Sequence, residues 1–219
     1  MRGLLLLTAT LLAGCVSSGT AYPLPEDGNT AVLSLAHAET KGEPLIRFTA
    51  DGRVLTRAGT AEIDDETLQD LLFYVVSTER FLDIDSQAVK LSIHQQNSHR
   101  GSALAVFNAP TTILELKLRD VSHRVEVHAL EFQANAHRNI PSLQRLLGIQ
   151  RRLIRESGTA LIGGREELAR LVTIATNELH KKHPERPGFT ELDLVGVGKR
   201  RKDGAIAATP SPPPASTPP

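Results

Sequence analysis

The chain has 219 residues, of which 40% are hydrophobic and 23% are charged, and this length and composition fit one globular domain with tails. Only 4% of the residues are aromatic and Trp is absent, so Leu, Val, Ile and Ala must build most of the core. The single cysteine, Cys15, lies close to the amino terminus, which excludes a disulfide in the folded domain.

The amino-terminal segment has the features of an export signal. Arg2 is its only charge, and the apolar run 4–12 is too short for a membrane-spanning helix, which needs about 20 residues. The run has the length of the hydrophobic region of a signal peptide. It ends in Leu12-Ala13-Gly14-Cys15, an aliphatic residue and two small residues before a thiol.

This ending resembles the lipobox of bacterial lipoproteins. The resemblance implies that residues 1–14 form a signal peptide, that cleavage precedes Cys15, and that diacylglycerol joins its sulfur while an acyl chain such as palmitate joins its new amino terminus. Several acyl chains make a firm anchor, where one chain alone is marginal. The lipid anchor implies a location in the cell envelope. Val16 stands where inner-membrane lipoproteins often carry Asp, and the absence of Asp favours the outer membrane. In a Gram-negative host that means the periplasmic face of the outer membrane or the cell surface.

Composition divides the remainder into a tether, a domain and a tail. Residues 15–29 carry the lipidated cysteine and a flexible tether of Ser, Gly, Pro and acidic residues. Residues 30–204 form a single domain, with a sheet and helix over 30–137 and a helical part over 138–204. Residues 205–219 contain six Pro and no charge, which predicts a disordered, Pro-rich tail that is either a frayed end or a ligand segment.

The first expected elements are strands over 30–37, 45–50 and 53–57. Asp51-Gly52 separates the second from the third and predicts a two-residue type I′ hairpin turn. That pairing would place Phe48 opposite Leu55.

A helix is expected after Asp64, which can cap its amino terminus, with Ile63 and Leu68 forming a hydrophobic staple. Its buried stripe consists of Leu68, Leu71, Leu72, Val75 and Val76. The run 81–84 should return to the core, a weaker helix should cover 85–94 with Asp85 as its cap, and 95–102 should be a polar loop.

Residues 111–118 and 123–129 alternate between apolar and polar side chains, which predicts an antiparallel hairpin with one wet face. The alternation requires paired residue numbers to have an odd sum. A sum of 241 would place Lys117 opposite Arg124, and like charges directly opposite are unfavourable. We therefore expect a sum of 239, which pairs Glu115 with Arg124, or of 243.

Two helices are expected in the last third. Pro141 suits the first position of one, with Gly158 near its end, and Gly163-Gly164 separates it from a second helix over 165–180. The buried side of the first should carry Leu143, Leu146, Leu147, Gln150 and Ile154.

This order of elements predicts an α+β fold: a small antiparallel sheet of hairpins packed with one central helix and a C-terminal helical pair. The series Asp51-Gly52-Arg53-Val54, helix, Phe81 and Pro110-Thr111-Thr112 resembles a small α+β domain of unknown function found in bacterial exported proteins. The resemblance covers residues 30–153 and implies a fold without an activity.

Charge is unevenly spread along the chain. Residues 16–137 hold 10 basic and 17 acidic side chains, whereas residues 138–202 hold 14 and 7. This division indicates either two solvated faces or a basic surface for an anionic partner. The candidate anion-binding residues are Arg151, Arg152, Arg155, Lys199, Arg200, Arg201 and Lys202.

No motif predicts catalysis, a metal site or a cofactor. The run 195–199 resembles the end of a phosphate-binding loop, but Asp193 and Arg200 stand where Gly and Ser or Thr are needed. His180 and His183 lie near a helix end without a second ligand pair, and Asp64 and Asp85 are explained as caps.

The sequence therefore predicts a membrane-anchored envelope lipoprotein with a non-enzymatic binding or structural role. Its expected partners are the membrane, through the lipid on Cys15, and either another protein or an anionic envelope component. Nucleic acid is not expected outside the cytoplasm. The alternative is a tethered hydrolase that acts on cell-wall or lipid substrates.

Overall fold

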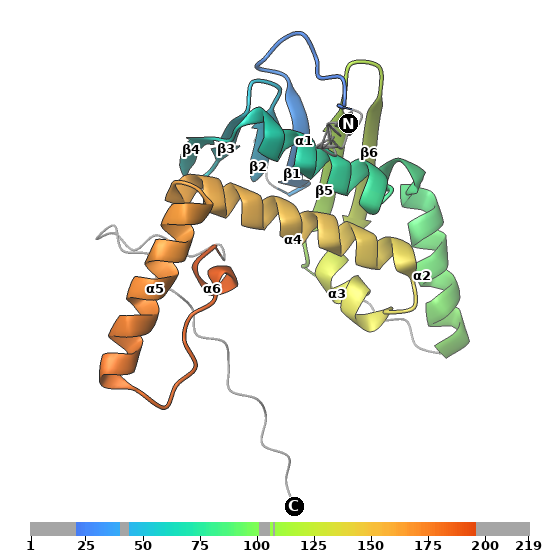
Figure 1. Cartoon of the computed structure of the whole chain (residues 1–219). Coiled ribbons are helices and arrows are strands. Elements are labelled where there is room, and N and C mark those ends of the chain that lie inside the picture. The colour runs from blue at the N-terminus through green and yellow to red at the C-terminus, as the bar shows by residue number, and fades with distance from the viewer. Residues whose placement is uncertain (1–20, 40–43, 101–105, 107, 196–219) are drawn as a thin grey trace, which may run out of the picture.

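The computed structural model describes residues 21–39, 44–100, 106 and 108–195 (Figure 1). Its strands are β1 (Ala31–His37), β2 (Ile46–Thr49), β3 (Arg53–Thr56), β4 (Gly59–Glu62), β5 (Thr111–Lys117) and β6 (Ser122–His128). Its longer helices are α1 (Asp65–Phe73), α2 (Ser86–Arg100), α3 (Leu130–Ala136), α4 (Pro141–Ile162) and α5 (Arg165–Lys182). Three short helical segments complete it: the π-helix η1 (Tyr74–Thr78), the 3₁₀-helix η2 (Phe81–Asp83) and α6 (Glu191–Val195).

The strands form one antiparallel sheet in the order β4-β3-β2-β1-β5-β6. The predicted α+β class is therefore confirmed, including its C-terminal helical pair, α4 and α5. The two hairpin groups meet where β1 pairs with β5, so Leu35 lies opposite Leu114 and Leu33 opposite Leu116. This long-range pairing joins the sheet into a single layer.

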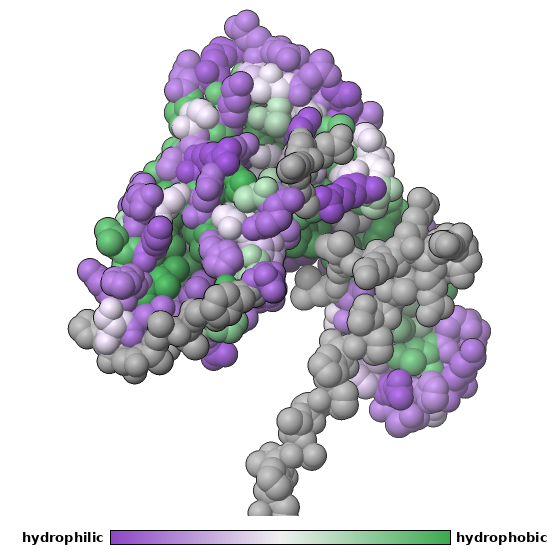
Figure 2. Space-filling model, turned by 180° about the vertical axis from the view of Figure 1, so that it is seen from behind, coloured by the Kyte–Doolittle hydropathy of each residue, from purple (hydrophilic) through white to green (hydrophobic). Residues whose placement is uncertain are grey.

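Helices α1 and α4 cover one face of the sheet (Figure 1). The core between these helices and the sheet is built from fully buried aliphatic side chains and two phenylalanines, Phe48 and Phe81. On the opposite face the register aligns Arg47, Ser34, Glu115 and Arg124 across four strands. Figure 2, which views the molecule from behind, shows hydrophilic residues over most of this side with hydrophobic patches between them.

The β2–β3 hairpin exists, but its predicted turn and register are wrong. Phe48 pairs with Val54, and Leu55 lies opposite Arg47, so the loop has three residues. The amide of Gly52 donates to the carbonyl of Thr49, and Gly52 has φ +83°. This geometry matches a turn closed by a left-handed glycine, and it brings Phe48 and Val54 together in the core, where both are fully buried.

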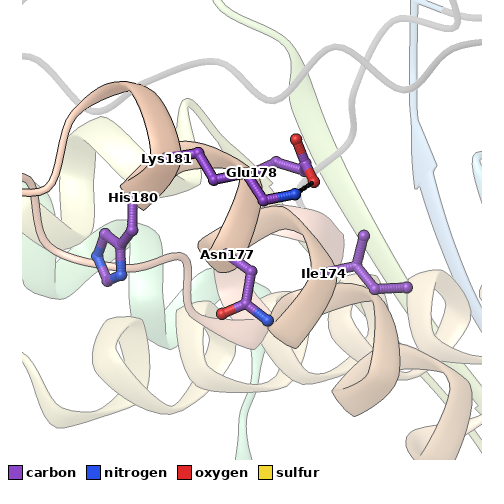
Figure 3. Close-up of a pocket in the computed structure, with 5 residues that line it drawn as sticks. All are labelled: Ile174, Asn177, Glu178, His180 and Lys181. Atoms are coloured by element: carbon purple, nitrogen blue, oxygen red, sulfur yellow. Dashed lines mark hydrogen bonds and ion pairs between the residues drawn. The ribbon is translucent and has the colours of Figure 1, made fainter.

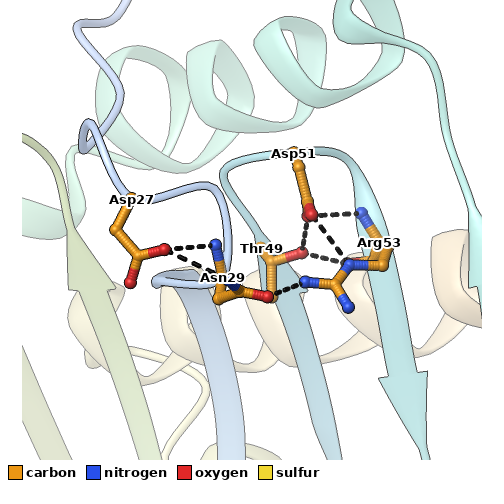
Figure 4. Close-up of polar contacts among 5 residues, drawn as sticks. All are labelled: Asp27, Asn29, Thr49, Asp51 and Arg53. Carbon is orange, nitrogen blue, oxygen red and sulfur yellow. Dashed lines mark hydrogen bonds and ion pairs between the residues drawn. The ribbon is translucent and has the colours of Figure 1, made fainter.

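Polar side chains fasten this turn to the segment before β1 (Figure 4). The hydroxyl of Thr49 and the Nε of Arg53 both donate to the carboxylate of Asp51, the latter over 2.8 Å, and Arg53 also donates to Asn29. The hydrogen bond from Thr49, followed by those from Arg53, holds the pKa of Asp51 below its ordinary value. Asp27 accepts from the amide of Asn29 on the other side.

The register of β5 and β6 follows the charge pattern. Paired residue numbers sum to 239, which places Glu115 opposite Arg124. The guanidinium of Arg124 lies 2.7 Å from Glu115 and 2.5 Å from Glu126. The predicted exclusion of a sum of 241 is confirmed.

Helix α1 begins as predicted: the carboxylate of Asp64 accepts from the amide of Thr67 over 2.7 Å. Leu68, Leu71, Leu72 and Val75 are buried, as expected, whereas Val76 is only half-buried. The predicted polar loop over 95–102 is wrong in the described part, since α2 continues to Arg100 after the cap by Asp85 on the amide of Ala88.

The segment before β1 is not a flexible tether along its whole described length. Tyr22 donates its amide to Gln69 of α1 over 2.8 Å and shares a hydrogen bond with Ser77. The carbonyl of Pro23 accepts from the amide of Arg119 in the β5–β6 turn, and Leu24 packs against the core. Described contacts therefore begin at Tyr22 rather than at residue 30.

Helix α4 passes through Gly158 and ends at the predicted Gly163-Gly164 break, where Gly163 has φ +107°. Gly158 allows a close approach of α6: a Cβ there would lie 2.8 Å from the carbonyl oxygen of Val195. The core face of α4 includes Ile149 and Leu153, while the predicted Gln150 and Ile154 are only half-buried.

Candidate functional site

Cys15 and the run Lys199, Arg200, Arg201 and Lys202 lie outside the described residues, so lipidation and half of the basic cluster stay predictions. The three arginines of α4 are described, and the candidate site is built from them. They occupy just over one turn of the helix, on either side of the core-facing Leu153.

The three guanidinium groups have different surroundings. The side chain of Arg151 is 63% exposed, and its closest acidic partner, Glu131 of α3, is 4.0 Å away. The side chain of Arg152 is only 24% exposed and is therefore largely covered by protein. Arg155 is intermediate.

A buried acid, Glu156, accounts for this difference. Its side chain is 6% exposed, with one carboxylate oxygen 3.0 Å from the Nε of Arg152 and 3.7 Å from the Nε of Arg155. The contact with Arg152 is an ion pair whose angle lies outside hydrogen-bond geometry. A buried carboxylate needs a nearby positive charge, and Arg152 and Arg155 supply it to Glu156. These two guanidinium groups are therefore less available to an external anion than Arg151.

Tyr74 of η1 extends the network toward the sheet-covering helix α1. The guanidinium of Arg152 lies over its ring, 5.5 Å from the centroid. Burial, followed by the hydrogen bond and negative charge of Glu79, raises the pKa of Tyr74 to about 12. Gly148 leaves room for the side chain of Tyr74, since a Cβ at position 148 would lie 3.1 Å from the Tyr74 hydroxyl.

Arg145, one helical turn before Gly148, also belongs to the network, because it donates a hydrogen bond to the carbonyl of Glu79 over 3.5 Å. Apart from Arg152 and Arg155, the residues of this network were not singled out from the sequence. The i, i+4 spacing of Arg152 and Glu156 and a glycine inside a long helix were the available signals. Neither reveals that η1 approaches from another part of the chain.

Two hollows lie elsewhere on the described surface. One is an open depression of about 550 Å³ along α5, lined by Ile174, Asn177, Glu178, His180 and Lys181 (Figure 3). Lys181 forms an ion pair with Glu178, and a ring nitrogen of His180 contacts the carbonyl oxygen of Arg186 over 2.9 Å. His180 thus has a structural partner inside its own helix–loop unit.

The second hollow, of about 330 Å³, lies where α2 packs beside β6. Apolar side chains of Val89, Ile93 and Val127 line it together with Gln133 and His128, among others. Both hollows mix hydrophobic and polar groups. Within the described ranges, no three His, Cys, Asp or Glu side chains lie together as metal ligands would.

Comparisons with protein-family models, with curated proteins and with solved structures found no match. In the part of the chain that the structure describes, no helix has the length and hydrophobicity to cross a membrane.

Proposed function

We propose that this protein is a lipid-anchored lipoprotein of the cell envelope whose α+β domain is a non-enzymatic binding module. The observation that carries the proposal is the apolar leader ending in Leu12-Ala13-Gly14-Cys15. Its partner in this proposal is a protein or an anionic envelope component that meets Arg151, the most exposed arginine of the α4 cluster.

Labelling with palmitate tests the anchor. Cys15→Ala should abolish incorporation of the label and leave an uncleaved or missorted precursor, because the thiol is the only group in the leader that can carry the lipid. Ser17→Ala, two residues later, should be labelled and sorted like the wild type. Normal labelling of Cys15→Ala would overturn the anchor.

Vesicle binding tests the anion site, with the chain produced without residues 1–15 so that the lipid does not mask the effect. Arg151→Gln should weaken binding to anionic vesicles about fivefold, since one basic side chain near such a surface contributes about 1 kcal/mol. Wild-type binding should fall as salt rises.

Arg170→Gln is the matched control, because its side chain is 60% exposed but forms two hydrogen bonds to Glu167. Equal losses for Arg151→Gln and Arg170→Gln would mean that binding follows net charge rather than a site at Arg151.

A further inference from the structure

We infer that the surface around the entry of the chain into the domain lies against the lipid bilayer. This entry face consists of Phe73 of α1, Leu82 of η2 and Val121 of the β5–β6 turn, around Tyr22. The inference rests on the proposed lipid anchor at Cys15 and adds an orientation to it.

The contacts of Tyr22 and Pro23 fix the place where the chain enters. Tyr22 is held by Gln69 and Ser77 on the outer side of α1 and η1, and Pro23 by Arg119 in the β5–β6 turn. In Figure 1 the described chain starts beside this turn, on the far side of α4 from α5 and α6.

The covalent reach from Cys15 to Tyr22 is short. Seven residue steps span at most about 25 Å when fully extended. A compact domain of this length has a radius of gyration of about 15 Å and thus a diameter of about 40 Å. The lipid on Cys15 therefore cannot bring the opposite end of the domain to the bilayer, whereas the entry face lies within its reach.

Exposed hydrophobic side chains surround this point. Phe73, 56% exposed, lies between Gln69 and Ser77 at spacings of four residues, so it shares a helix face with both contacts of Tyr22. Val121, 39% exposed, lies in the turn that holds Pro23, and its carbonyl accepts from Leu118.

Leu82 belongs to the same region through its neighbour Phe81. The ring of Phe81 contacts His123, two residues after Val121, with a centroid distance of 5.0 Å. Leu82 is 37% exposed. Three exposed apolar side chains thus belong to elements that hold Tyr22 or Pro23 or lie next to them, and such side chains can enter the headgroup region of a bilayer.

The charges of this region are mixed. Exposed Arg119 and Asp120 lie beside Val121, Asp70 lies one turn before Phe73, and Arg80 forms an ion pair with Asp83 next to Leu82. Opposite charges at close range favour a zwitterionic lipid surface over a strongly anionic one. With the entry face on the bilayer, α5 and α6 project away from it (Figure 1).

Fluorescence quenching tests this orientation on the full mature protein. Cys15 is the only cysteine and its sulfur is the proposed lipid attachment, so one added cysteine can carry a dye. The variants are Val121→Cys on the entry face and Ile174→Cys on α5, both exposed in the structure. Each is placed in phosphatidylcholine vesicles that contain a lipid with a nitroxide headgroup.

We expect several-fold stronger quenching at Val121→Cys than at Ile174→Cys. Adding Phe73→Ser should weaken the quenching at position 121, whereas adding Leu91→Ser, at a comparably exposed site on α2, should not. If the protein carries palmitate label but quenching is equal at the two positions, or stronger at position 174, the proposed orientation is wrong and the anchor stands. If the protein takes up no palmitate label, the proposed anchor itself is wrong.

Discussion

At the scale of single residues, charged side chains are held either by amides a few residues away or by groups from distant parts of the chain. Asp64 and Asp85 cap α1 and α2 as expected, because the amide that each accepts from is three residues away. The cluster of Tyr74, Glu79 and Glu156 could not be predicted, since it depends on how η1 and α4 meet. Local charge patterns are visible in the sequence, whereas burial of a charged residue is visible only in the fold.

The pKa of Tyr74 gives a prediction at this scale. Because folding raises the pKa from 10.0 to about 12, the folded state favours the neutral phenol. Its contribution to stability is complete below pH 10 and is lost as the pH rises from 10 to about 12. Chemical denaturation measures the unfolding free energy below and above pH 10. Between these two pH values it should fall less for Tyr74→Phe than for the wild type.

Tyr22→Phe serves as the control, since Tyr22 is the only other tyrosine. Its absorbance titration should retain the high-pH transition that Tyr74→Phe lacks. If the denaturation curves of wild type and Tyr74→Phe kept the same pH dependence, the phenol would not be coupled to folding.

At the scale of elements, the two hairpins show when register can be predicted. Between β5 and β6, the charges of Glu115, Lys117 and Arg124 exclude one register, and the observed pairing agrees. Between β2 and β3, Asp51-Gly52 suits both a two-residue and a three-residue loop, so core packing of Phe48 decides. The short β4, α3 and α6 were missed because segments of four to seven residues carry too little periodicity.

The three-residue loop predicts a specific cost for Gly52→Ala. Gly52 has φ +83°, and a Cβ there would lie 2.5 Å from the carbonyl oxygen of Ile63. Gly163→Ala is the matched control, because Gly163 also has positive φ but its nearest contact would be 3.6 Å away. We expect a loss of about 1 kcal/mol for Gly163→Ala, from the backbone conformation alone.

Gly52→Ala should cost about 2–4 kcal/mol, since steric overlap adds to the unfavourable backbone conformation. Urea denaturation of both variants measures the difference. Equal losses would show that the β2–β3 turn yields to the added methyl group without strain.

At the scale of the whole molecule, the sequence predicts the class of fold but not its assembly. The pairing of β1 with β5 and the passage of α4 across the sheet depend on contacts between distant residues. Helix α4 is the common support, because it packs on the core along its length and also contacts α5 and α6. The glycines Gly148 and Gly158 mark where neighbouring elements approach its two halves.

These two glycines predict separable responses to the same substitution. Gly158→Ala places a Cβ 2.8 Å from the carbonyl of Val195 and should displace α6. Gly148→Ala places one 3.1 Å from the Tyr74 hydroxyl and should disturb η1 instead. In each case the alanine gains up to about 1 kcal/mol of helix propensity, so α4 itself should persist.

Hydrogen exchange measured along the chain distinguishes the two variants. Gly158→Ala should speed exchange in 183–195 and leave α1 and the six strands unchanged, because few contacts join α6 to the sheet. Gly148→Ala should speed exchange in 74–84 and leave α6 unchanged. Faster exchange throughout the sheet in Gly158→Ala would mean that α5 and α6 are an integral part of the core. Faster exchange confined to 183–195, in contrast, would show that α6 and the segment before it can open without unfolding the sheet.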